Sequence, residues 1–455
     1  MNSSVKKFSL TGLRTSQLFD PRYVLYHVNS LKRYQTIQGF GGAMTDATAM
    51  NIATLSVPTQ QKLLRQYFGD GSINYSFIRL PIGGTDFSTR YYSLDDVVND
   101  TSLEHFNLTE EDLIYKIPYT KQAMAISKHE IKLFASTWSA PLWMTRPRFS
   151  KPSFTKLQEQ YRQLHADYHI KFLDAYKMHS LNFWGITAHN EPVSGFLYYV
   201  AFNNMGWTPE EQRDWVTNYF GPTLHKSGYG NLKLMILDDQ RVFLPLWPTI
   251  MMNEEAKKFV SGIAVHFYTD IFPISQASLL SDTHDKFPDL FILNTEACIF
   301  PLSGGVAVSL GLWDHAEIYA ESIIENINNW SIGWVDWNMA LNLDGGPNWA
   351  YNNVNAPIIV NATADEFYKQ PTFYALAHFS KFVPPESQRI QLISANSKGL
   401  LSSSFITPQH DIVIVLVNKL NFDMSTCITA GLKGNIELVL PAHSIHTIIY
   451  KNGII

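Results

Sequence analysis

Cysteine is scarce in this 455-residue chain, which contains only Cys298 and Cys427. Two cysteines cannot form a disulfide framework or a cysteine-rich metal site. No uninterrupted apolar run reaches the length of about 18 residues that a membrane-spanning helix needs, so we predict no such helix. The net charge is −5, and lysine and arginine do not cluster along the chain. This balance argues against a nucleic-acid partner.

Motifs of several enzyme classes are also missing. The chain has neither His-x-His nor His-Glu-x-x-His, the patterns that hold catalytic zinc. It also lacks the Gly-x-Ser-x-Gly turn of serine hydrolases and a glycine-rich phosphate loop ending in Gly-Lys-Ser or Gly-Lys-Thr. We therefore predict neither a metal site nor a cofactor.

One apolar segment ends in a group of polar residues. Residues 183–188 are mainly apolar and are followed by His189, Asn190 and Glu191. Pro192 then prevents further strand pairing because it has no N–H to donate. This pattern predicts a buried strand that presents an acid at its C-terminal end.

A second segment has the same form, because the apolar residues 291–293 are followed shortly by Glu296. In a barrel of parallel strands, the carboxyl ends of all strands meet on one face, which carries the chemistry. Glu191 and Glu296 would then face each other across a pocket, as glycoside hydrolysis requires. The residues alone leave open that either glutamate is only an ion-pair partner.

Strand patterns alternate with helical patterns through most of the chain, which is typical of a parallel sheet. We predict eight strands, at residues 36–40, 76–80, 131–137, 182–188, 232–237, 262–265, 291–293 and 332–335. Helices are predicted at residues 58–67, 119–127, 157–179, 209–219, 254–260, 315–328 and 373–382. Eight such units predict an α/β fold, a (β/α)8 TIM barrel over residues 38–383.

The pattern changes after Pro384 and Pro385, where helical periodicity ceases. Strands bounded by turn residues are expected at 412–418, 436–440 and 444–450. We predict an additional antiparallel β-sandwich domain formed by residues 384–455 and joined by N-terminal strands within residues 1–37. The strand at 412–418 is apolar on both faces, which predicts a central position in the sandwich.

Other strand ends carry candidate functional groups whose roles the residues leave open. Arg79 either keeps a neighbouring carboxylate ionised or forms a structural ion pair. Asp86 binds sugar hydroxyls or caps a turn, and Trp138 stacks on a sugar or packs under a loop. The adjacent acids Asp238 and Asp239 are predicted to form a turn, and Asp46 to cap a helix. Further candidates at strand ends are His266, Tyr268 and Trp337.

The sequence resembles the glucosylceramidases of glycoside hydrolase family thirty. The resemblance extends from about residue 39 to residue 450, nearly the whole chain. It rests on ordered blocks at residues 39–46 (GFGGAMTD), 86–88 (DFS), 190–192 (NEP), 237–241 (LDDQR), 295–298 (TEAC), 336–338 (DWN), 345–349 (GGPNW) and 379–382 (FSKF).

The resemblance implies roles for particular residues. Glu191 would be the acid/base and Glu296 the nucleophile of a reaction that retains anomeric configuration, with the carboxylates roughly 5 Å apart. The implied sugar-binding residues are Asp86, Trp138, Asn190, Trp337 and Asn352, and Arg79, His266 and Tyr268 would surround the nucleophile. Position 189 is His where the human-type sequence of the family carries Glu, a difference expected to shift the pH profile.

The resemblance also implies a substrate and a setting. The expected substrate is glucosylceramide or a related β-glucoside, met at an anionic membrane surface of the lysosome, with a saposin-type activator as a possible partner. Apolar loops at residues 196–199 and 242–247 are predicted to contact lipid, with buried packing as the alternative. Charging of the 15 histidines at acidic pH would favour an anionic surface.

A secretory route is expected from glycosylation sequons, although residues 1–10 show no signal-peptide core. The sequons begin at Asn2, Asn74, Asn99, Asn107, Asn329 and Asn361. Two other functions remain open, namely a related β-glycosidase acting on steryl glucosides or xylosides, and a non-catalytic carbohydrate- or lipid-binding protein on the same fold.

Overall fold

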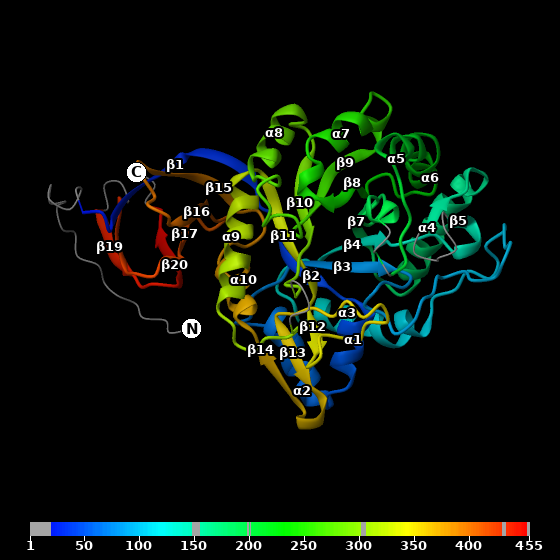
Figure 1. Ribbon diagram of the computed structural model, residues 1–455, viewed down its shortest axis with the longest axis horizontal. Helices are drawn as coiled ribbons and strands as arrows, with labels where there is room; N and C mark the ends of the chain where they lie inside the picture. Colours follow the sequence, from blue (N-terminus) through cyan, green and yellow to red (C-terminus); the bar gives the residue numbers. More distant parts are fainter. Residues whose placement is uncertain are drawn as a thin grey trace.

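The computed structural model describes residues 20–147, 155–197, 200, 202–301, 306–429 and 434–452. Eight parallel strands close into a barrel, which confirms the predicted fold (Figure 1). In chain order they are β2 (Gly39–Ala43), β3 (Phe77–Ile82), β4 (Lys132–Thr137), β7 (Phe183–Thr187), β8 (Lys233–Gln240), β9 (Val260–His266), β10 (Phe291–Glu296) and β11 (Ser331–Asn338). Every predicted barrel strand overlaps one of them.

Helices cover the outside of the barrel. They are α1 (Asp46–Ala53), α2 (Val57–Tyr67), α3 (Ile117–Ile126), α4 (Arg162–Met178), α5 (Pro209–Trp215), α6 (Gly221–Lys226), α7 (Leu246–Met251), α8 (Ser278–Lys286), α9 (Asp314–Asn328) and α10 (Pro371–Ser380). Among the described residues, no helix combines the length and apolarity needed to span a bilayer.

Two local predictions about helices are wrong. The helix predicted at 254–260 is only a short 3-10 turn, Ala256–Lys258, because Val260 already pairs with Leu234 in the barrel ladder. Asp46 is not the capping residue of α1; the hydroxyl of Thr45 accepts the N–H of Thr48 instead. Barrel pairing and side-chain geometry override local propensity at both places.

A seven-stranded sheet forms the second domain. Its spatial order is β19–β18–β1–β15–β16–β17–β20. The strands are β1 (Tyr23–Thr36), β15 (Gln388–Ser394), β16 (Leu401–Ile406), β17 (Asp411–Asn418), β18 (Met424–Thr429), β19 (Asn435–Leu440) and β20 (Ser444–Lys451). The sheet curls around an apolar core of its own. All pairs are antiparallel, as predicted, except that β1 runs parallel to β18.

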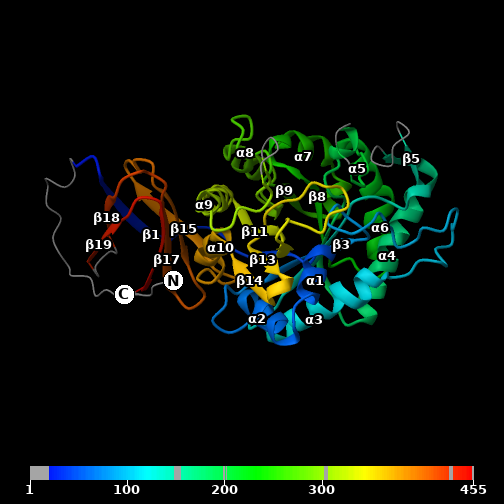
Figure 2. The same cartoon turned by 60° about the horizontal axis from the view of Figure 1, so that its bottom comes forward.

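The apolar faces of β17 explain how the two domains meet. Ile412, Ile414 and Leu416 belong to the core of the curled sheet. The alternate residues Val413 and Val415 join the core of the barrel domain. Helices α9 and α10 lie between the sheet and the barrel in both views (Figures 1 and 2). The strand is therefore buried on both faces, as its sequence predicts.

Smaller elements follow the C-terminal ends of barrel strands. A two-stranded hairpin, β5 (Thr145–Pro147) and β6 (Thr155–Leu157), follows β4. A three-stranded sheet of β12 (Ala340–Asn342), β13 (Ile358–Asn361) and β14 (Glu366–Lys369) follows β11. The sequence patterns did not predict either element. Both belong to the βα loops of the barrel, which form the face that carries the chemistry in this architecture.

Candidate active site

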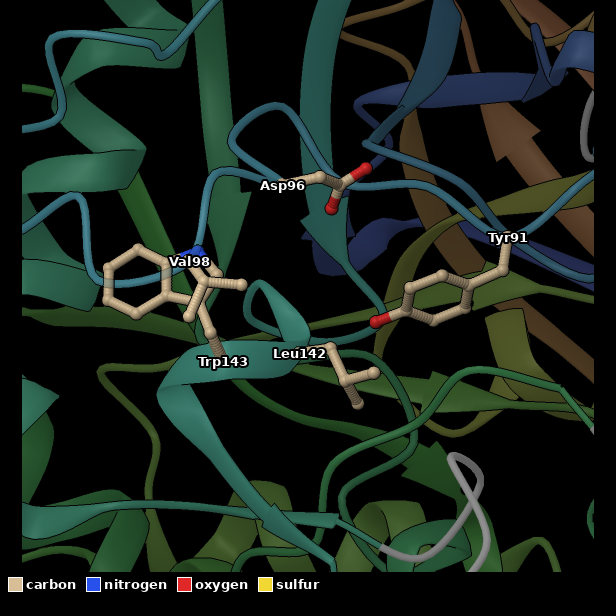
Figure 3. A pocket seen from close by; sticks show the side chains of 5 residues that line it. All are labelled: Tyr91, Asp96, Val98, Leu142 and Trp143. Atoms are coloured by element: carbon tan, nitrogen blue, oxygen red, sulfur yellow. The ribbon is translucent and has the colours of Figure 1, made fainter.

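An open, mainly apolar cavity of about 460 Å³ lies among the loops that follow β3 and β4 (Figure 3). It is lined by Tyr91, Asp96, Val98, Leu142 and Trp143. Its one carboxylate, on Asp96, accepts hydrogen bonds from the backbone and hydroxyl of Ser93. With no second carboxylate to work with Asp96, this lining is suited to apolar contact rather than to glycoside hydrolysis.

Side-chain contacts connect the lining of the cavity to Asp86 through two aromatic rings. The ring of Tyr91 lies edge-on to Trp349, with centroids 6.3 Å apart. The indole N–H of Trp349 donates to the carbonyl of Thr85, the residue before Asp86. Asp86 in turn accepts a hydrogen bond of 2.8 Å from Asn352. The cavity is thus connected by short contacts to two of the predicted sugar-binding residues.

Glu191 follows β7 on a strained turn. Its φ is +43°, an uncommon value for a residue with a side chain. Two ladder-like bonds hold the turn: the N–H of Asn190 donates to Thr137, and that of Glu191 donates to Asp238. Neighbouring strands β4 and β8 therefore fix the direction of the Glu191 side chain, and such fixed strain is typical of functional sites.

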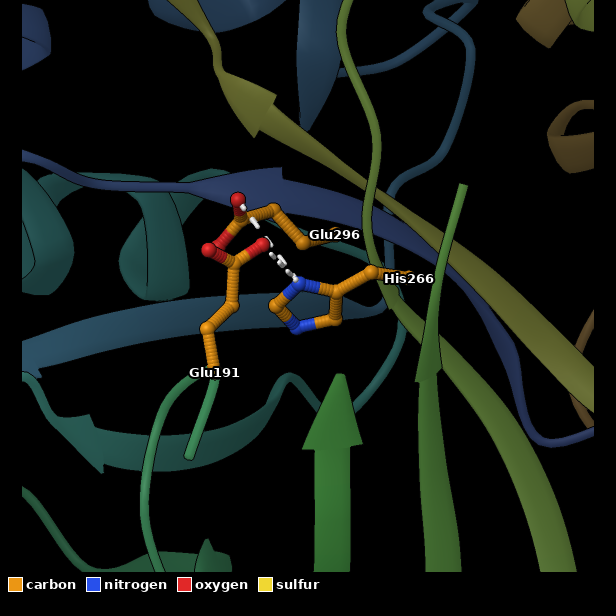
Figure 4. A group of neighbouring side chains, drawn as sticks. All are labelled: Glu191, His266 and Glu296. Atoms are coloured by element: carbon orange, nitrogen blue, oxygen red, sulfur yellow. Dashed lines mark hydrogen bonds and ion pairs between the residues drawn. The ribbon is translucent and has the colours of Figure 1, made fainter. Parts of the chain in front are cut away.

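Glu296 is the last residue of β10 and is in register with His266, the last residue of β9. The side chains of Glu191, His266 and Glu296 point toward one another (Figure 4). One ligand atom of each lies within 4.8 Å of those of the other two. The structure thus brings together the two glutamates that the strand-end pattern singled out.

His266 bridges two carboxylates. Its Nδ1 lies 3.0 Å from Glu191 Oε1, and its Nε2 lies 3.0 Å from Asp238 Oδ1. Burial lowers the pKa of this imidazole, but the charges of Glu296 and Asp238 and the bond to Glu191 outweigh it and raise the pKa to about 10. The ring is therefore an imidazolium that donates from both nitrogens at neutral and acidic pH.

Arg79 contacts three of the site residues and is fully buried. Its guanidinium pairs with Glu296, donates to Asn190 Oδ1 at 2.7 Å and contacts Asp238 at 2.9 Å. Burial raises the pKa of the Glu296 carboxyl, and the cations Arg79 and His266 oppose this effect. The two cations occupy the surroundings that a metal ion would need, so the trio of Glu191, His266 and Glu296 is better suited to proton transfer than to metal binding.

Tyr268 adds a neutral donor to the nucleophile position. Its hydroxyl donates to Glu296 Oε1 at 2.7 Å. Burial and nearby acidic groups raise the pKa of the phenol well above its ordinary value, so it remains protonated. The hydroxyl therefore stabilises the ionised form of Glu296 without carrying charge.

The turn predicted at Asp238 and Asp239 is wrong. Asp238 does not form a turn with Asp239, because β8 continues to Gln240. A bulge places Asp238 between the register pairs Leu237–Ala264 and Asp239–Val265, with positive φ at Leu237 and Asp238. The bulge directs the carboxylate toward the barrel interior. Although burial raises the pKa of Asp238, Arg79 and His266 hold it well below its usual range.

Sequence reasoning missed several neighbours of this centre. Thr295 donates to Asp238 at 2.6 Å and Ser136 donates to it at 3.0 Å, so both hydroxyls support the buried carboxylate. Gln240 donates to Glu191 Oε1 at 2.8 Å. Their position at the C-terminal ends of strands was the available signal, but their short polar side chains have many structural uses.

The predicted sugar-binding residues lie around the same centre. Trp138 and Trp337 stack on each other with centroids 5.1 Å apart, and each ring also covers the Arg79 guanidinium. Both tryptophans are almost fully buried, so little of either ring is open to a ligand. Burial raises the pKa of Asp86 to about 7, against the hydrogen bond from Asn352.

His189 is fully buried beside Trp207, just beyond the end of β7. Burial lowers the pKa of His189 to about 3. The ring is therefore neutral at weakly acidic pH, and the expected effect of having His rather than Glu at this position on the pH profile stays a prediction.

Both domains of the chain match models of known protein families. A model of the glycosyl hydrolase family 30 TIM-barrel domain matches residues 37–383, and one of the family 30 beta sandwich domain matches residues 386–448. The chain belongs to glycosyl hydrolase family 30. It is therefore a glycoside hydrolase.

Similar proteins include several curated relatives. The chain is 44% identical to "Lysosomal acid glucosylceramidase" of Mus musculus, covering 92% of this chain and 82% of that protein. It is 41% identical to "Putative glucosylceramidase 4" of Caenorhabditis elegans, covering 93% and 83%. Among solved structures, SrfJ from Salmonella typhimurium aligns with a TM-score of 0.87 at 26% identity, covering 98% of this chain and 95% of that one.

Proposed function

We propose that this family 30 hydrolase is a retaining β-glucosidase that hydrolyses glucosylceramide to glucose and ceramide by double displacement. The observation that carries the proposal is the meeting of Glu191 and Glu296, whose ligand atoms lie within 4.8 Å. Retaining glycosidases hold their two carboxyl groups about 5 Å apart, whereas inverting enzymes separate them by about 6.5–9.5 Å to admit water.

In this scheme Glu296 attacks the anomeric carbon while Glu191 protonates the departing glycosidic oxygen. The bond from carbon to the leaving oxygen breaks as the ester bond to Glu296 forms. Glu191 then accepts a proton from water, which attacks the same carbon and releases Glu296. Arg79, which contacts Glu296, and Tyr268, which donates to it, stabilise its carboxylate before attack and after release.

The sugar-binding roles form part of the proposal. Asn190 is oriented by its bond to Arg79, so its amide N–H group is available to the sugar 2-hydroxyl. Asp86 and Asn352 form a hydrogen-bonded pair suited to sugar hydroxyls, and Trp138 and Trp337 bound the pocket. These groups supply placed polar contacts that orient a ligand.

An apolar aglycone is supported by the loops of the same face. Large apolar side chains are exposed on loops that follow six different barrel strands, at Val98, Leu142, Leu246, Phe272, Ile274, Val306, Leu310 and Tyr351. Exposed apolar groups gathered on one face are typical of lipid contact. The apolar cavity beside Trp143 lies among these loops and would accept hydrocarbon from the aglycone.

The two segments predicted to contact lipid differ in exposure from residue to residue. Within 242–247, Leu244 and Trp247 are buried and only Leu246 is well exposed. Phe196 and Leu197 are partly exposed, whereas residues 198 and 199 lie outside the described residues. Leu244 and Trp247 therefore pack in the interior, and lipid contact by the remaining residues of the two segments stays a proposal.

The proposed setting is the lysosomal lumen at an anionic membrane surface, with a saposin-type activator as a possible partner. The sequons at Asn99 and Asn107 are exposed on the surface, where a glycan would fit. Histidine contributes less to surface binding than the sequence predicts. Burial lowers the pKa of seven of the 15 histidines: His165, His169, His189, His284, His315, His378 and His446.

The test compares the wild-type protein with Glu296→Gln on an aryl β-glucoside at pH about 5. We expect activity only in the wild type, and a covalent adduct on Glu296 after incubation with a slow 2-fluoro glucoside. The wild type should also release ceramide from glucosylceramide in anionic vesicles. A folded wild type that hydrolyses neither substrate would favour a binding protein, and preference for a steryl glucoside or a xyloside would identify a different β-glycosidase.

A further inference from the structure

Gln240, the last residue of β8, contacts the oxygen of Glu191 that also faces the imidazolium. Its Nε2 lies 2.8 Å from Glu191 Oε1, and His266 Nδ1 lies 3.0 Å from the same oxygen. A carboxylate oxygen can only accept hydrogen bonds, so Gln240 must present its amide N–H to it rather than its carbonyl. Oε1 of Glu191 therefore receives two donors.

We propose that Gln240 is a positioning residue for the acid/base and determines which oxygen of Glu191 moves the proton. An oxygen that accepts two hydrogen bonds is the less basic one of a carboxyl group, because both donors stabilise its lone pairs. The proton is then carried on Oε2. Oε2 gives it to the leaving oxygen in the first step and takes one from water in the second. This inference rests on the proposed retaining mechanism.

The chain fixes Gln240 through its neighbours. Gln240 is in register with His266 across the β8–β9 ladder, so both donors come from adjacent strand ends. The carboxyl group of Asp239 accepts the N–H of Gln240 at 2.7 Å and that of Val193 at 2.9 Å. Because Val193 follows the turn that carries Glu191, one buried carboxyl group joins the donor strand to the acid/base turn.

Titratable and charged groups on several strands lie around Glu191, so the effect of Gln240 on the pH profile has to be separated from theirs. They are Arg79 on β3, Asp86 after it, Asp238 and Asp239 on β8, His266 on β9 and Glu296 on β10. A substitution at Gln240 that preserves charge and size leaves all of them in place.

The test is Gln240→Met, which keeps the length of the side chain and removes its donor. Loss of the donor destabilises the carboxylate form of Glu191, so we expect the basic limb of kcat/KM to move up by about one pH unit. With the proton no longer confined to Oε2, kcat/KM for an alkyl β-glucoside should fall about tenfold. A dinitrophenyl β-glucoside, whose leaving group needs no proton, should keep its kcat/KM.

Two further variants separate positioning from folding. In Gln240→Glu, the new carboxyl group donates only while protonated, so activity on the alkyl glucoside should recover at low pH and fall as the group ionises. Gln212→Met is the matched control, because Gln212 binds Leu237 N–H and Trp247 but not Glu191. It should lower thermal stability without changing the ratio between the two substrates.

Equal losses on both glucosides in Gln240→Met, or an unmoved basic limb, would overturn the proposed role of Gln240. If the wild type hydrolyses neither glucoside, the proposed function fails. The activity of the wild type therefore distinguishes failure of the proposed function from failure of the proposed role of Gln240. A changed substrate ratio in Gln212→Met would also count against the inference, since that residue does not contact the acid/base.

Discussion

The charge on Asp238 should set the pH range of the enzyme, although Asp238 does not reach the substrate. Asp238 is fully buried and holds both cations of the site, Arg79 at 2.9 Å and His266 at 3.0 Å. Asp238→Asn preserves the shape of the side chain and removes one negative charge. The remaining positive charge then favours the carboxylate forms of Glu191 and Glu296.

The size of this effect follows from the geometry. Asp238 and Glu191 each lie 3.0 Å from one nitrogen of the same imidazole. With the width of the ring, their charges are on the order of 7 Å apart, which corresponds to about 2 kcal/mol at an effective dielectric constant of about 20. This free energy equals about 1.5 pH units. We therefore expect the basic limb of kcat/KM to move down by about 1.5 units.

The assay is the pH dependence of kcat/KM on an aryl β-glucoside, measured at temperatures where each variant is folded. Asp336→Asn is the matched control. Asp336 is also buried in the barrel, but burial raises its pKa well above the ordinary value, so its carboxyl group is already neutral. It should leave the limb in place. An unmoved limb in Asp238→Asn, or equal shifts in both variants, would refute the electrostatic reasoning.

Four other variants have defined expectations. Tyr268→Phe removes a donor to Glu296 and should raise the pKa of that carboxyl group, so the acidic limb moves to higher pH; an unchanged acidic limb would contradict this. His189→Gln should leave both limbs in place in the same profile, because the imidazole is neutral at working pH. Leu142→Asp should lower turnover of glucosylceramide in vesicles about fivefold and spare a soluble aryl glucoside; equal losses would exclude lipid contact at the cavity. Ile414→Ala, in the core of the curled sheet, should reduce the free energy of unfolding by about 2–5 kcal/mol in denaturant titrations without changing the activity of folded protein.

The barrel was predictable because buried parallel strands are continuous apolar runs, and their polar ends are visible in the sequence. This pattern alone was enough to predict that Glu296 lies at the end of a barrel strand. Asp238 was not predictable, because its direction depends on a bulge in β8 that is defined against β9. Two adjacent acids are also ordinary turn residues, so local chemistry favoured the wrong conclusion.

Contacts between distant segments were also beyond the sequence. Nothing local to Trp138 or Trp337 indicates that they stack on each other, and this contact decides how much of each ring a sugar can reach. Alternation predicted strands near Tyr23 and their addition to the C-terminal sheet, but not the parallel pairing with β18. The division of the chain near residues 38 and 384 and the roles of individual site residues stay predictions.

The place of β1 in the middle of the C-terminal sheet has a consequence for biosynthesis. Its partners β15 and β18 lie far along the chain, so Gln35 is synthesised 354 residues before Arg389, with which it hydrogen-bonds. The barrel strands all lie between β1 and β15 in the chain, so β1 has no partner strand while they are being synthesised. Lys32 and Arg33 lie within this unpaired strand, and charged side chains on an unpaired strand oppose its pairing with other chains. During synthesis from the N-terminus, the ladders of β1 therefore cannot form until β15 and β18 have been made.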